Sequence, residues 1–399
     1  MPKPKLILIN HYASLPRWPG PTRNFDFGAA LVKRGWEVSL FSCRFNHYLR
    51  HYLHETPRAE SGVKLRFVWS TPYQGNSLLR ELNILVFSFV SFWIGLFTSG
   101  NVILTVTPPL ESAFAAWLLA RVKRIPFVLD VEDLWPDSII AMGFRSRPVI
   151  AWLRFLEAFL YKHSDHFFVV AAEMKQYLIN QGVPPAKIDL IPLGANAPQF
   201  HESRREVRDR YGWGEDQTVA VYVGAHGPAN ALETLIKAAE ALPAESGIKI
   251  VLFGDGSDKP RLKELAAYLG LRNLVLEEPV PPERVPDILR AADIGIATLK
   301  NTDTFKTVRP NKLYEYMAVG LPIICGIAGE AKRFVEESGA GITITPEDYR
   351  GLAGALQKLA WNKALCDTLS AKGRAYFESR GNREQLAQDM DVSLRKVII

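Results

Sequence analysis

The sequence has 399 residues, of which 48% are hydrophobic and 23% are charged. This length is too great for one ordinary core and this composition excludes a disordered or fibrous protein, so we expect two globular domains. The net charge is +6 at pH 7, and residues 1–80 hold twelve Lys or Arg against four Asp or Glu. Such a basic region predicts attraction to membrane lipids, nucleic acid or phosphorylated substrates.

Cysteine and histidine usage argues against a metal site. Cys43, Cys325 and Cys366 are far apart and share no metal-ligand or redox spacing, which indicates a reducing compartment. The eight histidines form no zinc motif. The opening stretch, MPKPKLILINHY, has an apolar run of five residues, too short for a signal peptide and typical of a first β-strand. We therefore expect no metal, no cofactor and a cytosolic location.

Strand-length apolar runs alternate with helix-length segments, which is typical of parallel sheets covered on both faces. In the first half the pattern predicts strands over 5–10, 37–42, 64–69, 101–106, 126–131 and 166–170, with helices over 22–34, 111–123 and 149–163. In the second half it predicts strands over 219–224, 248–254, 274–279, 294–299 and 322–326, with helices over 231–242 and 260–270. The predicted fold class is α/β, with two doubly wound Rossmann-like domains whose strand-end loops face a cleft.

The domain boundary is predicted in the polar, proline-containing stretch 191–206. We assign residues 1–195 to an N-terminal domain and 196–380 to a C-terminal domain. Residues 381–399 are predicted to form a helix that packs over either domain. Whether this helix crosses back to the N-terminal domain is left open.

Residues 82–110 contain no charged side chain. The first part, 82–98, is barely long enough to span a bilayer, and polar residues dilute it. We favour a buried helix followed by the strand over 101–106. The alternative is a helix that lies at the membrane surface.

Two loops of the N-terminal domain carry candidate residues, because ligands of open α/β sheets bind beyond the carboxyl ends of strands. In HYASLPRWPGPTRNFDFG, Gly20 allows close backbone approach, Thr22 is placed to cap the next helix and Arg23 adds a cation. This loop serves a structural role as readily as a binding one.

The second loop, VEDLWPDS, places three carboxylates around a Leu-Trp-Pro group. For Asp133 we favour a functional role, as an acceptor of sugar hydroxyl hydrogen bonds or as a base, whereas for Trp135 we favour packing.

In the C-terminal domain, VYVGAHGPANALETL places Gly224 and Gly227 between a strand and a helix, where backbone N–H groups can meet phosphate. It is not a Walker loop. His226 either reaches the phosphates or is incidental. In the next turn, LFGDGSDKPRLKEL, Gly254 and Gly256 are predicted to let the backbone approach a flat base.

The stretch FKTVRPNKLYEYMAVGLPIICG places three cations, Lys306, Arg309 and Lys312, ahead of Glu315. Because Lys312 and Glu315 are three residues apart, a surface ion pair is one interpretation. The functional interpretation is that the cations bind a diphosphate while Glu315 accepts hydrogen bonds from two ribose hydroxyls.

Together these motifs resemble the retaining GT-B glycosyltransferases of glycosyltransferase family 4 over nearly the whole chain. The Asp-Leu-Trp-Pro and Lys-Leu-Tyr-Glu-Tyr-Met-Ala-x-Gly-x-Pro motifs are most similar to bacterial enzymes that add an amino sugar, such as N-acetylfucosamine, to lipid-linked precursors of surface polysaccharides.

The resemblance implies a nucleotide-sugar donor in the C-terminal domain, an acceptor in the N-terminal domain and no required metal. It implies that Glu315 binds the donor ribose, Lys312 the diphosphate, and that Gly20 and Asp133 lie near the donor and the reacting sugar.

The sequence also departs from the family pattern. A second carboxylate usual in the family is Thr307 here, the usual Gly-Gly of the first loop is Gly20-Pro21, and the usual Arg before the loop aspartate is Glu132.

The leading hypothesis is a retaining glycosyltransferase, peripherally associated with the cytosolic face of a membrane. It uses a UDP-sugar donor and a polyprenyl-diphosphate-linked saccharide acceptor in surface-polysaccharide or O-antigen assembly, with no nucleic acid partner. The resemblance implies front-face attack, with the departing phosphate helping to take the acceptor proton.

We assign Asp133, Lys312 and Glu315 to catalysis, and donor binding to the residues Gly20, Gly224, His226, Gly227, Gly254, Arg309, Lys312 and Glu315. The alternatives are a sugar-nucleotide epimerase or hydrolase of the same fold and a non-catalytic nucleotide-sugar-binding partner.

Overall fold

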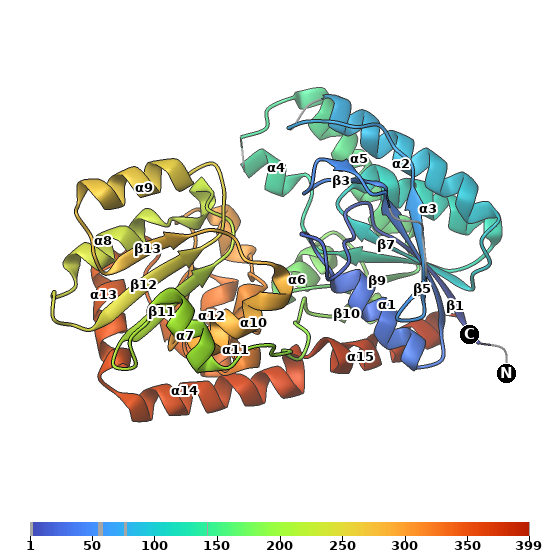
Figure 1. Cartoon of the computed structure of the whole chain (residues 1–399). Coiled ribbons are helices and arrows are strands. Elements are labelled where there is room, and N and C mark those ends of the chain that lie inside the picture. The colour runs from blue at the N-terminus through green and yellow to red at the C-terminus, as the bar shows by residue number, and fades with distance from the viewer. Residues whose placement is uncertain (1–2, 55–58, 76–77, 142, 399) are drawn as a thin grey trace. The chain divides into compact units, whose positions relative to one another are not determined.

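The computed structural model describes residues 3–54, 59–75, 78–141 and 143–398. Its contacts divide the chain into two compact units (Figure 1). Unit 1 comprises Met1–Leu193 and Arg383–Ile399, and unit 2 comprises Gly194–Asn382. The predicted boundaries after residues 195 and 380 each lie two residues from these divisions.

Unit 1 contains an eight-stranded sheet with the order β10-β9-β8-β7-β1-β2-β6-β5. Its strands are parallel except for β5, which runs antiparallel to β6. The strands are β1 (Lys5–Ile9), β2 (Glu37–Cys43), β5 (Ala59–Glu60), β6 (Val63–Val68), β7 (Val102–Thr107), β8 (Phe127–Val131), β9 (His166–Val169) and β10 (Ile188–Leu190). A separate hairpin, β3 (Phe45–Asn46) with β4 (His51–Tyr52), follows β2.

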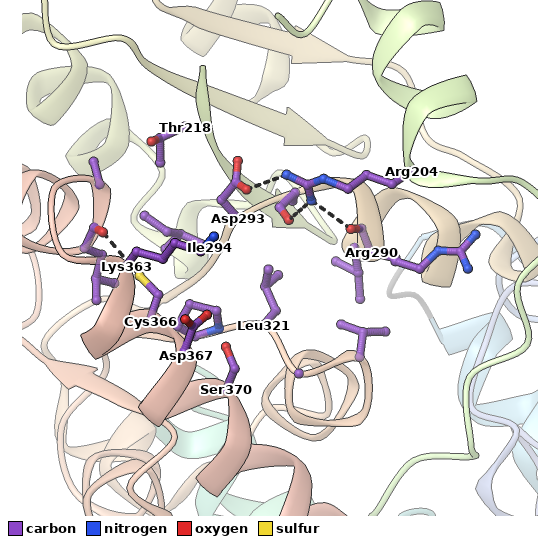
Figure 2. Close-up of a pocket in the computed structure, with 17 residues that line it drawn as sticks. Arg204, Thr218, Arg290, Asp293, Ile294, Leu321, Lys363, Cys366, Asp367 and Ser370 are labelled. Atoms are coloured by element: carbon purple, nitrogen blue, oxygen red, sulfur yellow. Dashed lines mark hydrogen bonds and ion pairs between the residues drawn. The ribbon is translucent and has the colours of Figure 1, made fainter. Parts of the chain in front are cut away.

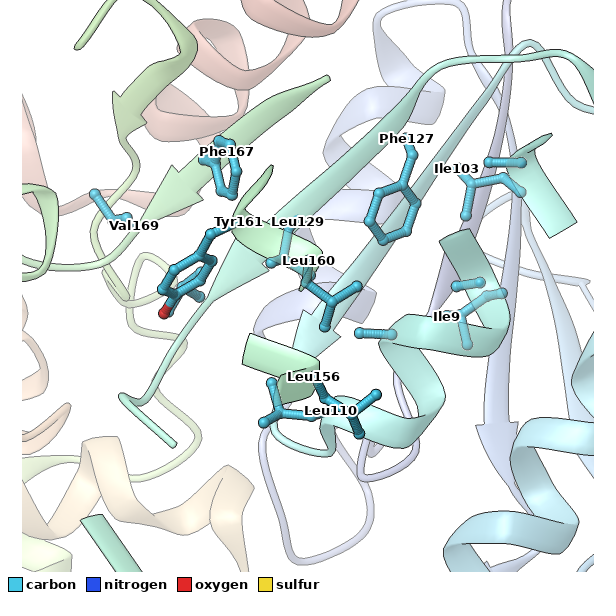
Figure 3. Close-up of a cluster of buried hydrophobic side chains, with 14 of the residues drawn as sticks. Ile9, Ile103, Leu110, Phe127, Leu129, Leu156, Leu160, Tyr161, Phe167 and Val169 are labelled. Atoms are coloured by element: carbon cyan, nitrogen blue, oxygen red, sulfur yellow. The ribbon is translucent and has the colours of Figure 1, made fainter. Parts of the chain in front are cut away.

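The helices of unit 1 cover both faces of this sheet. They are α1 (Arg23–Lys33), α2 (Leu78–Leu96), α3 (Leu110–Lys123), α4 (Asp137–Ala141), α5 (Arg147–His163), α6 (Ala172–Asn180) and α15 (Arg383–Val397), with one 3-10 turn, η1 (Pro185–Lys187). Alternate residues of β1 point to opposite cores: Leu6 and Leu8 meet α1 and α15, whereas Ile7 and Ile9 meet α3 and α5 (Figure 3). Each fully buried Leu, Ile or Phe stabilises the fold by about 1.5–3 kcal/mol.

Helix α2 differs from the favoured expectation of a buried helix. Its inner face, which includes Phe87 and Gly95, is buried, and there is no room for a side chain at Gly95 because Leu119 of α3 packs against it. Its outer face is exposed: Phe89 and Trp93 are 64% and 50% accessible. Within the described residues, α2 is the one helix long and apolar enough to cross a membrane, judged by length and composition alone.

Unit 2 contains a six-stranded parallel sheet with the order β13-β12-β11-β14-β15-β16. The strands are β11 (Thr218–Val223), β12 (Ile248–Phe253), β13 (Leu274–Glu277), β14 (Ile294–Thr298), β15 (Ile323–Gly326) and β16 (Gly341–Thr343). The helices are α7 (Arg204–Tyr211), α8 (Glu233–Ala241), α9 (Lys259–Tyr268), α10 (Val285–Ala291), α11 (Lys312–Val319), α12 (Glu330–Ser338), α13 (Tyr349–Ala360) and α14 (Lys363–Tyr376). Three 3-10 turns, η2 (Pro228–Asn230), η3 (Pro282–Arg284) and η4 (Asp303–Thr307), and one π-helical turn, η5 (Phe377–Gly381), complete it.

The predicted fold class is confirmed, since both units are doubly wound and Rossmann-like. Every strand predicted from an apolar run is present within one or two residues of its expected bounds. The short strands β5, β10 and β16 and the β3–β4 hairpin were not predicted, because two or three residues carry too little periodicity.

Candidate active site

The order of the strands in unit 2 reverses between β11 and β14. The loops that follow these two strands therefore leave the sheet in opposite directions, and in open parallel sheets ligands bind outside the carboxyl ends of the strands at such a reversal. Gly224, His226 and Gly227 follow β11, whereas Arg309 and Lys312 follow β14. The structure thus brings together most of the residues predicted for the C-terminal domain.

Lys312 is the first residue of α11, and its half-buried ammonium group lies at the carboxyl end of β11. Its Nζ is 3.5 Å from the centroid of the Tyr222 ring. A Cβ on Gly224 would lie 3.1 Å from the same Nζ. Burial lowers the pKa of Lys312 to about 7, with the carboxylate of Glu315 partly opposing this shift. Among the described residues, no carboxylate forms an ion pair with Lys312.

Glu315 lies in the first turn of α11 and is half-buried. Asn311 donates a hydrogen bond from Nδ2 to Oε1 of Glu315 at 2.8 Å, which fixes the orientation of the carboxylate. Oε2 has no partner within the part of the chain that the structure describes. The surface ion pair between Lys312 and Glu315 is therefore not formed, and both groups keep binding capacity. The helix ends at Gly320, where φ is 73° and the N–H donates back to Met317.

His226 is fully buried between the two glycine-containing loops. Its backbone N–H donates to Asp255 at 2.8 Å, and its carbonyl oxygen accepts from Asp258 at 2.9 Å. Neither ring nitrogen makes a well-formed hydrogen bond to the described residues, although the ring lies near the backbone of Phe253. Burial, reinforced by the charge of Lys259, lowers the pKa of His226. This placement favours a packing role, in which the neutral imidazole holds the two loops together. It does not favour contact with a phosphate.

The glycines of the second turn allow close packing against the first glycine-containing loop. A Cβ on Gly254, whose φ is 144°, would lie 1.8 Å from the carbonyl oxygen of Gly224. A Cβ on Gly256 would lie 2.5 Å from the carbonyl oxygen of His226. The neighbouring loop occupies the space that each Cβ would fill. The approach of these glycines to a flat base stays a prediction. Gly227, with φ of −105°, has no conformational need to be glycine.

Arg309 does not present its guanidinium to the reversal. It pairs with the buried carboxylate of Glu330 at the start of α12 and donates to Tyr314 Oη at 2.8 Å. Its guanidinium also lies 4.4 Å from the centroid of the Phe334 ring. The predicted contact between Arg309 and a diphosphate is replaced by a link between α11 and α12. Thr307, in place of the family carboxylate, donates to the carbonyl oxygen of Thr304 at 3.1 Å.

In unit 1, Asp133 organises its own loop. Its Oδ1 accepts a hydrogen bond from Ser138 Oγ, and its Oδ2 accepts one from Trp135 Nε1 at 3.2 Å. Burial raises the pKa of Asp133, and these hydrogen bonds oppose the rise. Trp135 packs against the core, in agreement with the packing interpretation. The sugar contact predicted for Asp133 stays a prediction.

The first loop of unit 1 corrects two further expectations. Arg23 is 2% exposed and donates to Asp130, to Glu132 at 2.9 Å and to the carbonyl oxygen of Ile191 at 3.0 Å, so it is not a surface cation for a ligand. Thr22 makes no side-chain cap. Its hydroxyl instead donates to Asp26 at 2.7 Å and accepts from Arg383 at 3.0 Å, which ties α15 to α1.

Gly20 has a φ of 123°, and a Cβ there would lie 2.6 Å from Cε2 of Tyr48. The glycine is therefore needed for the Tyr48 ring to pack across this loop. A donor contact of Gly20 stays a prediction.

Two cavities in unit 2 lie at opposite edges of the sheet. One of about 180 Å³ opens at the carboxyl ends of β11 and β12 and is lined by Val223, Gly224, Ala225, Phe253, Gly254, Asp255, Pro279 and Val280. The other, of about 400 Å³, lies where β11, β14 and β15 begin, and Figure 2 shows Arg204 held there by Asp293. None of the predicted site residues lines this larger cavity, so the smaller one belongs to the candidate site.

The chemistry available at the reversal is one ammonium, one oriented carboxylate and the positive end of the α11 helix dipole. Among the described residues no group of three His, Cys, Asp or Glu is placed to hold a metal ion. The site thus suits an anion with vicinal hydroxyls nearby. The sequence analysis missed Tyr222 and Asn311. An aromatic residue in a buried strand gives no sign of a binding role, whereas the position of Asn311, four residues before Glu315, could have predicted their contact.

Two family models match the chain in succession. The model for the glycosyl transferase 4-like domain matches residues 22–194, and the model for glycosyl transferases group 1 matches residues 203–376. The chain is 24% identical to D-inositol 3-phosphate glycosyltransferase of Mycobacteroides abscessus, over 69% of this chain and 67% of that protein. Relatives of the same name from other species are matched over 56–89% of their own length.

Solved structures share the fold at low sequence identity. HepE of Anabaena, solved in complex with UDP, is 14% identical with a TM-score of 0.75, and 98% of this chain and all of that chain are covered. WaaG, a glycosyltransferase involved in lipopolysaccharide biosynthesis, is 15% identical with a TM-score of 0.70, and 96% of this chain and 98% of that chain are covered. The two successive family matches and the two Rossmann-like sheets show that the chain belongs to the GT-B glycosyltransferases, with a glycosyl transferase 4-like domain followed by a group 1 domain.

Proposed function

We propose that the protein is a retaining glycosyltransferase that moves an N-acetylated amino sugar from a UDP-sugar to a lipid-linked saccharide in surface-polysaccharide or O-antigen assembly. The observation that carries the donor assignment is the pair Lys312 and Glu315, which share the first turn of α11 at the strand-order reversal without pairing with each other. A nucleotide diphosphate has the matching chemistry, because it offers an anionic diphosphate and two ribose hydroxyls. HepE, a structural neighbour, is solved with UDP.

In this proposal the two side chains have different tasks. Glu315, oriented by Asn311, accepts hydrogen bonds from the ribose hydroxyls and so positions the donor. Lys312 and the positive end of the α11 helix dipole stabilise the negative charge that grows on the leaving diphosphate. Tyr222 holds the ammonium group over its ring before the donor binds. Retention follows front-face attack, with the departing phosphate helping to take the acceptor proton.

The acceptor assignment rests on an exposed apolar face of unit 1. This apolar face consists of Leu82, Leu85, Phe89 and Trp93 of α2, Leu118 and Val122 of α3, and Trp152 and Phe155 of α5, each 40–64% accessible. The spacing in α2 places its four residues on one side of the helix. Helix α3 packs against both α2 and α5, so the three helices form one layer. Soluble proteins rarely expose a large contiguous apolar patch, and a helix face with Trp, Phe and Leu is typical of helices that lie at a membrane surface.

Cations border this apolar face. Arg124 follows α3, Arg145 and Arg147 lie at the start of α5, and Lys162 lies near its end, and all four are exposed. Each Lys or Arg near an anionic leaflet contributes about 1 kcal/mol to binding. We therefore place the protein at the cytosolic face of an anionic membrane, where a lipid-linked acceptor is presented. A soluble acceptor such as an inositol phosphate, which the names of several relatives suggest, needs no such face.

The transfer reaction itself is the test of the proposed function. Incubation with a panel of labelled UDP-sugars and a polyprenyl-diphosphate-linked saccharide is expected to move the label into the organic phase on extraction. Release of free or isomerised sugar in place of transfer would favour a hydrolase or epimerase. Transfer to D-inositol 3-phosphate alone would overturn the lipid-linked acceptor.

Glu315→Ala is expected to weaken UDP binding by about tenfold to a hundredfold, because two hydrogen bonds to a charged group are lost. Calorimetric titration with UDP measures the effect, and an unchanged thermal midpoint shows that the fold is intact. Glu337→Ala, which removes an exposed carboxylate on α12, is the matched control. Equal UDP affinity in the Glu315 variant and the control would exclude the ribose assignment.

UDP affinity is expected to depend on pH through Lys312. Its pKa is about 7 in the free protein, and a bound diphosphate raises it, so binding takes up a proton at alkaline pH. The dissociation constant should therefore rise by up to about tenfold per pH unit above 7. Lys312→Arg should bind UDP with no such dependence, because the guanidinium stays charged. An affinity of the wild-type protein that is flat between pH 7 and 9 would contradict this assignment.

Membrane binding is tested by flotation with vesicles that contain an anionic phospholipid. The wild-type protein is expected to float at low salt and to float less at high salt. The double substitution Phe89→Glu with Trp93→Glu should abolish flotation while UDP binding is retained, since each buried aromatic contributes about 1.5–3 kcal/mol. Tyr268→Glu, at an exposed aromatic position of unit 2, is the control. Wild-type protein that stays at the bottom at low salt would refute the membrane assignment.

A further inference from the structure

Unit 1 contains an aromatic cluster, one member of which, Tyr73, also packs in the core. It comprises Tyr12, His47, Tyr48 and Tyr73, with Arg50 and Arg80 beside them. Tyr12 follows β1, His47 and Tyr48 lie in the hairpin that follows β2, and Tyr73 follows β6. These three strands are neighbours in the sheet, so their carboxyl-end loops converge. Strand β1 also borders β7 at the point where the strand order of unit 1 reverses, which is where an open sheet binds a ligand.

The rings of the cluster hold one another in fixed positions. The centroids of Tyr12 and His47 are 5.3 Å apart and those of His47 and Tyr48 are 5.1 Å apart, both in edge-to-face contact. His47 Nδ1 is hydrogen-bonded to Tyr73 Oη. Asn46 Oδ1 accepts hydrogen bonds from the N–H groups of Tyr48 and Leu49 at 2.8 and 2.9 Å, which locks the turn. Tyr48 packs against the loop at Gly20 but remains 47% exposed, so part of this residue is accessible to a ligand.

Two arginines give the cluster its positive charge. Arg80 donates to Tyr12 Oη at 2.9 Å, and the Arg50 guanidinium lies 5.3 Å from the centroid of the Tyr73 ring. Burial lowers the pKa of His47 to about 4, and the charges of Arg50 and Arg80 both add to this effect, so the two cations converge on the same ring. His47 is therefore neutral at physiological pH. Glu81, the residue after Arg80, offsets part of the charge.

The cluster and the apolar face share helix α2. Arg80 lies in the first turn of this helix, and the exposed row Leu82, Leu85, Phe89 and Trp93 begins two residues later on the other side of it. A molecule that combines a diphosphate, a sugar and a hydrocarbon chain matches this sequence of surfaces: arginines for the diphosphate, tyrosine rings for the sugar and α2 for the chain.

We propose that the aromatic cluster binds the diphosphate and the first sugar of the lipid-linked acceptor, with Arg50 and Arg80 on the diphosphate and Tyr48 against the sugar. This inference rests on the proposed function, which it deepens by naming the residues that recognise the acceptor.

The probe for the diphosphate is farnesyl diphosphate, titrated by calorimetry into the full chain, with farnesol as the uncharged comparison. The wild-type protein is expected to bind the diphosphate at least about tenfold more tightly than farnesol. Arg50→Gln and Arg80→Gln should each remove about tenfold of that affinity, and UDP affinity should not change. Arg66→Gln, which removes an exposed cation on β6, is the matched control. If Arg80→Gln lowers the thermal midpoint because Tyr12 loses its partner, the exposed Arg50 still carries the test.

The second measurement is the transfer assay, in which Tyr48→Ala and Arg50→Gln should raise the acceptor KM at least about tenfold with the donor KM unchanged. Equal binding of farnesol and farnesyl diphosphate, or a wild-type acceptor KM in both variants, would overturn the assignment of the cluster. Failure of the proposed function gives a different result, namely no transfer to any lipid-linked saccharide by the wild-type protein.

Discussion

The reversal of strand order between β11 and β14 is the constraint on which the donor site depends. It separates two loops that would otherwise run side by side, and it lets α11 begin where β11 ends, so that Lys312 lies over Tyr222. The glycine loops after β11 and β12 then close against each other, with Gly254 directly against Gly224. The half-buried ammonium group of Lys312 lies over the Tyr222 ring while Asn311 orients the Glu315 carboxylate, and the two charged groups do not pair.

The sequence analysis predicted the parts of the fold and site that depend on local pattern. Apolar runs predicted the long parallel strands, and the position of Glu315 before a late strand predicted its place at the carboxyl edge. Contacts between distant residues were not predictable: Arg23 and Asp130 are 107 residues apart, and Arg309 and Glu330 are 21 apart. Each arginine was therefore interpreted as a ligand contact, although a buried carboxylate holds it. Helix α2 was predicted only in part, because uniform hydrophobicity does not distinguish a fully buried helix from one with an exposed apolar face.

The two units have different surface chemistry around the same architecture. Unit 1 exposes aromatic and aliphatic side chains beside cations, which suits a partner with a hydrocarbon part and an anionic part. Unit 2 places its candidate donor-binding groups, Lys312 and Glu315, at the carboxyl ends of its strands. A single sheet type thus provides two kinds of binding surface, because specificity resides in the loops and outer helix faces and not in the strands.

Helix α15 has a consequence for the order in which the chain can fold during synthesis. Its residues Leu386, Met390 and Leu394 complete the core of unit 1, and Trp36 donates to Asp391 of the same helix. Unit 2 is one uninterrupted segment, whereas unit 1 is completed only after α15, which follows unit 2 in the chain, has been synthesised. Until then Leu8 and Leu40 lack part of their cover, so the nascent N-terminal sheet exposes an aggregation-prone surface that a ribosome-associated chaperone would have to protect.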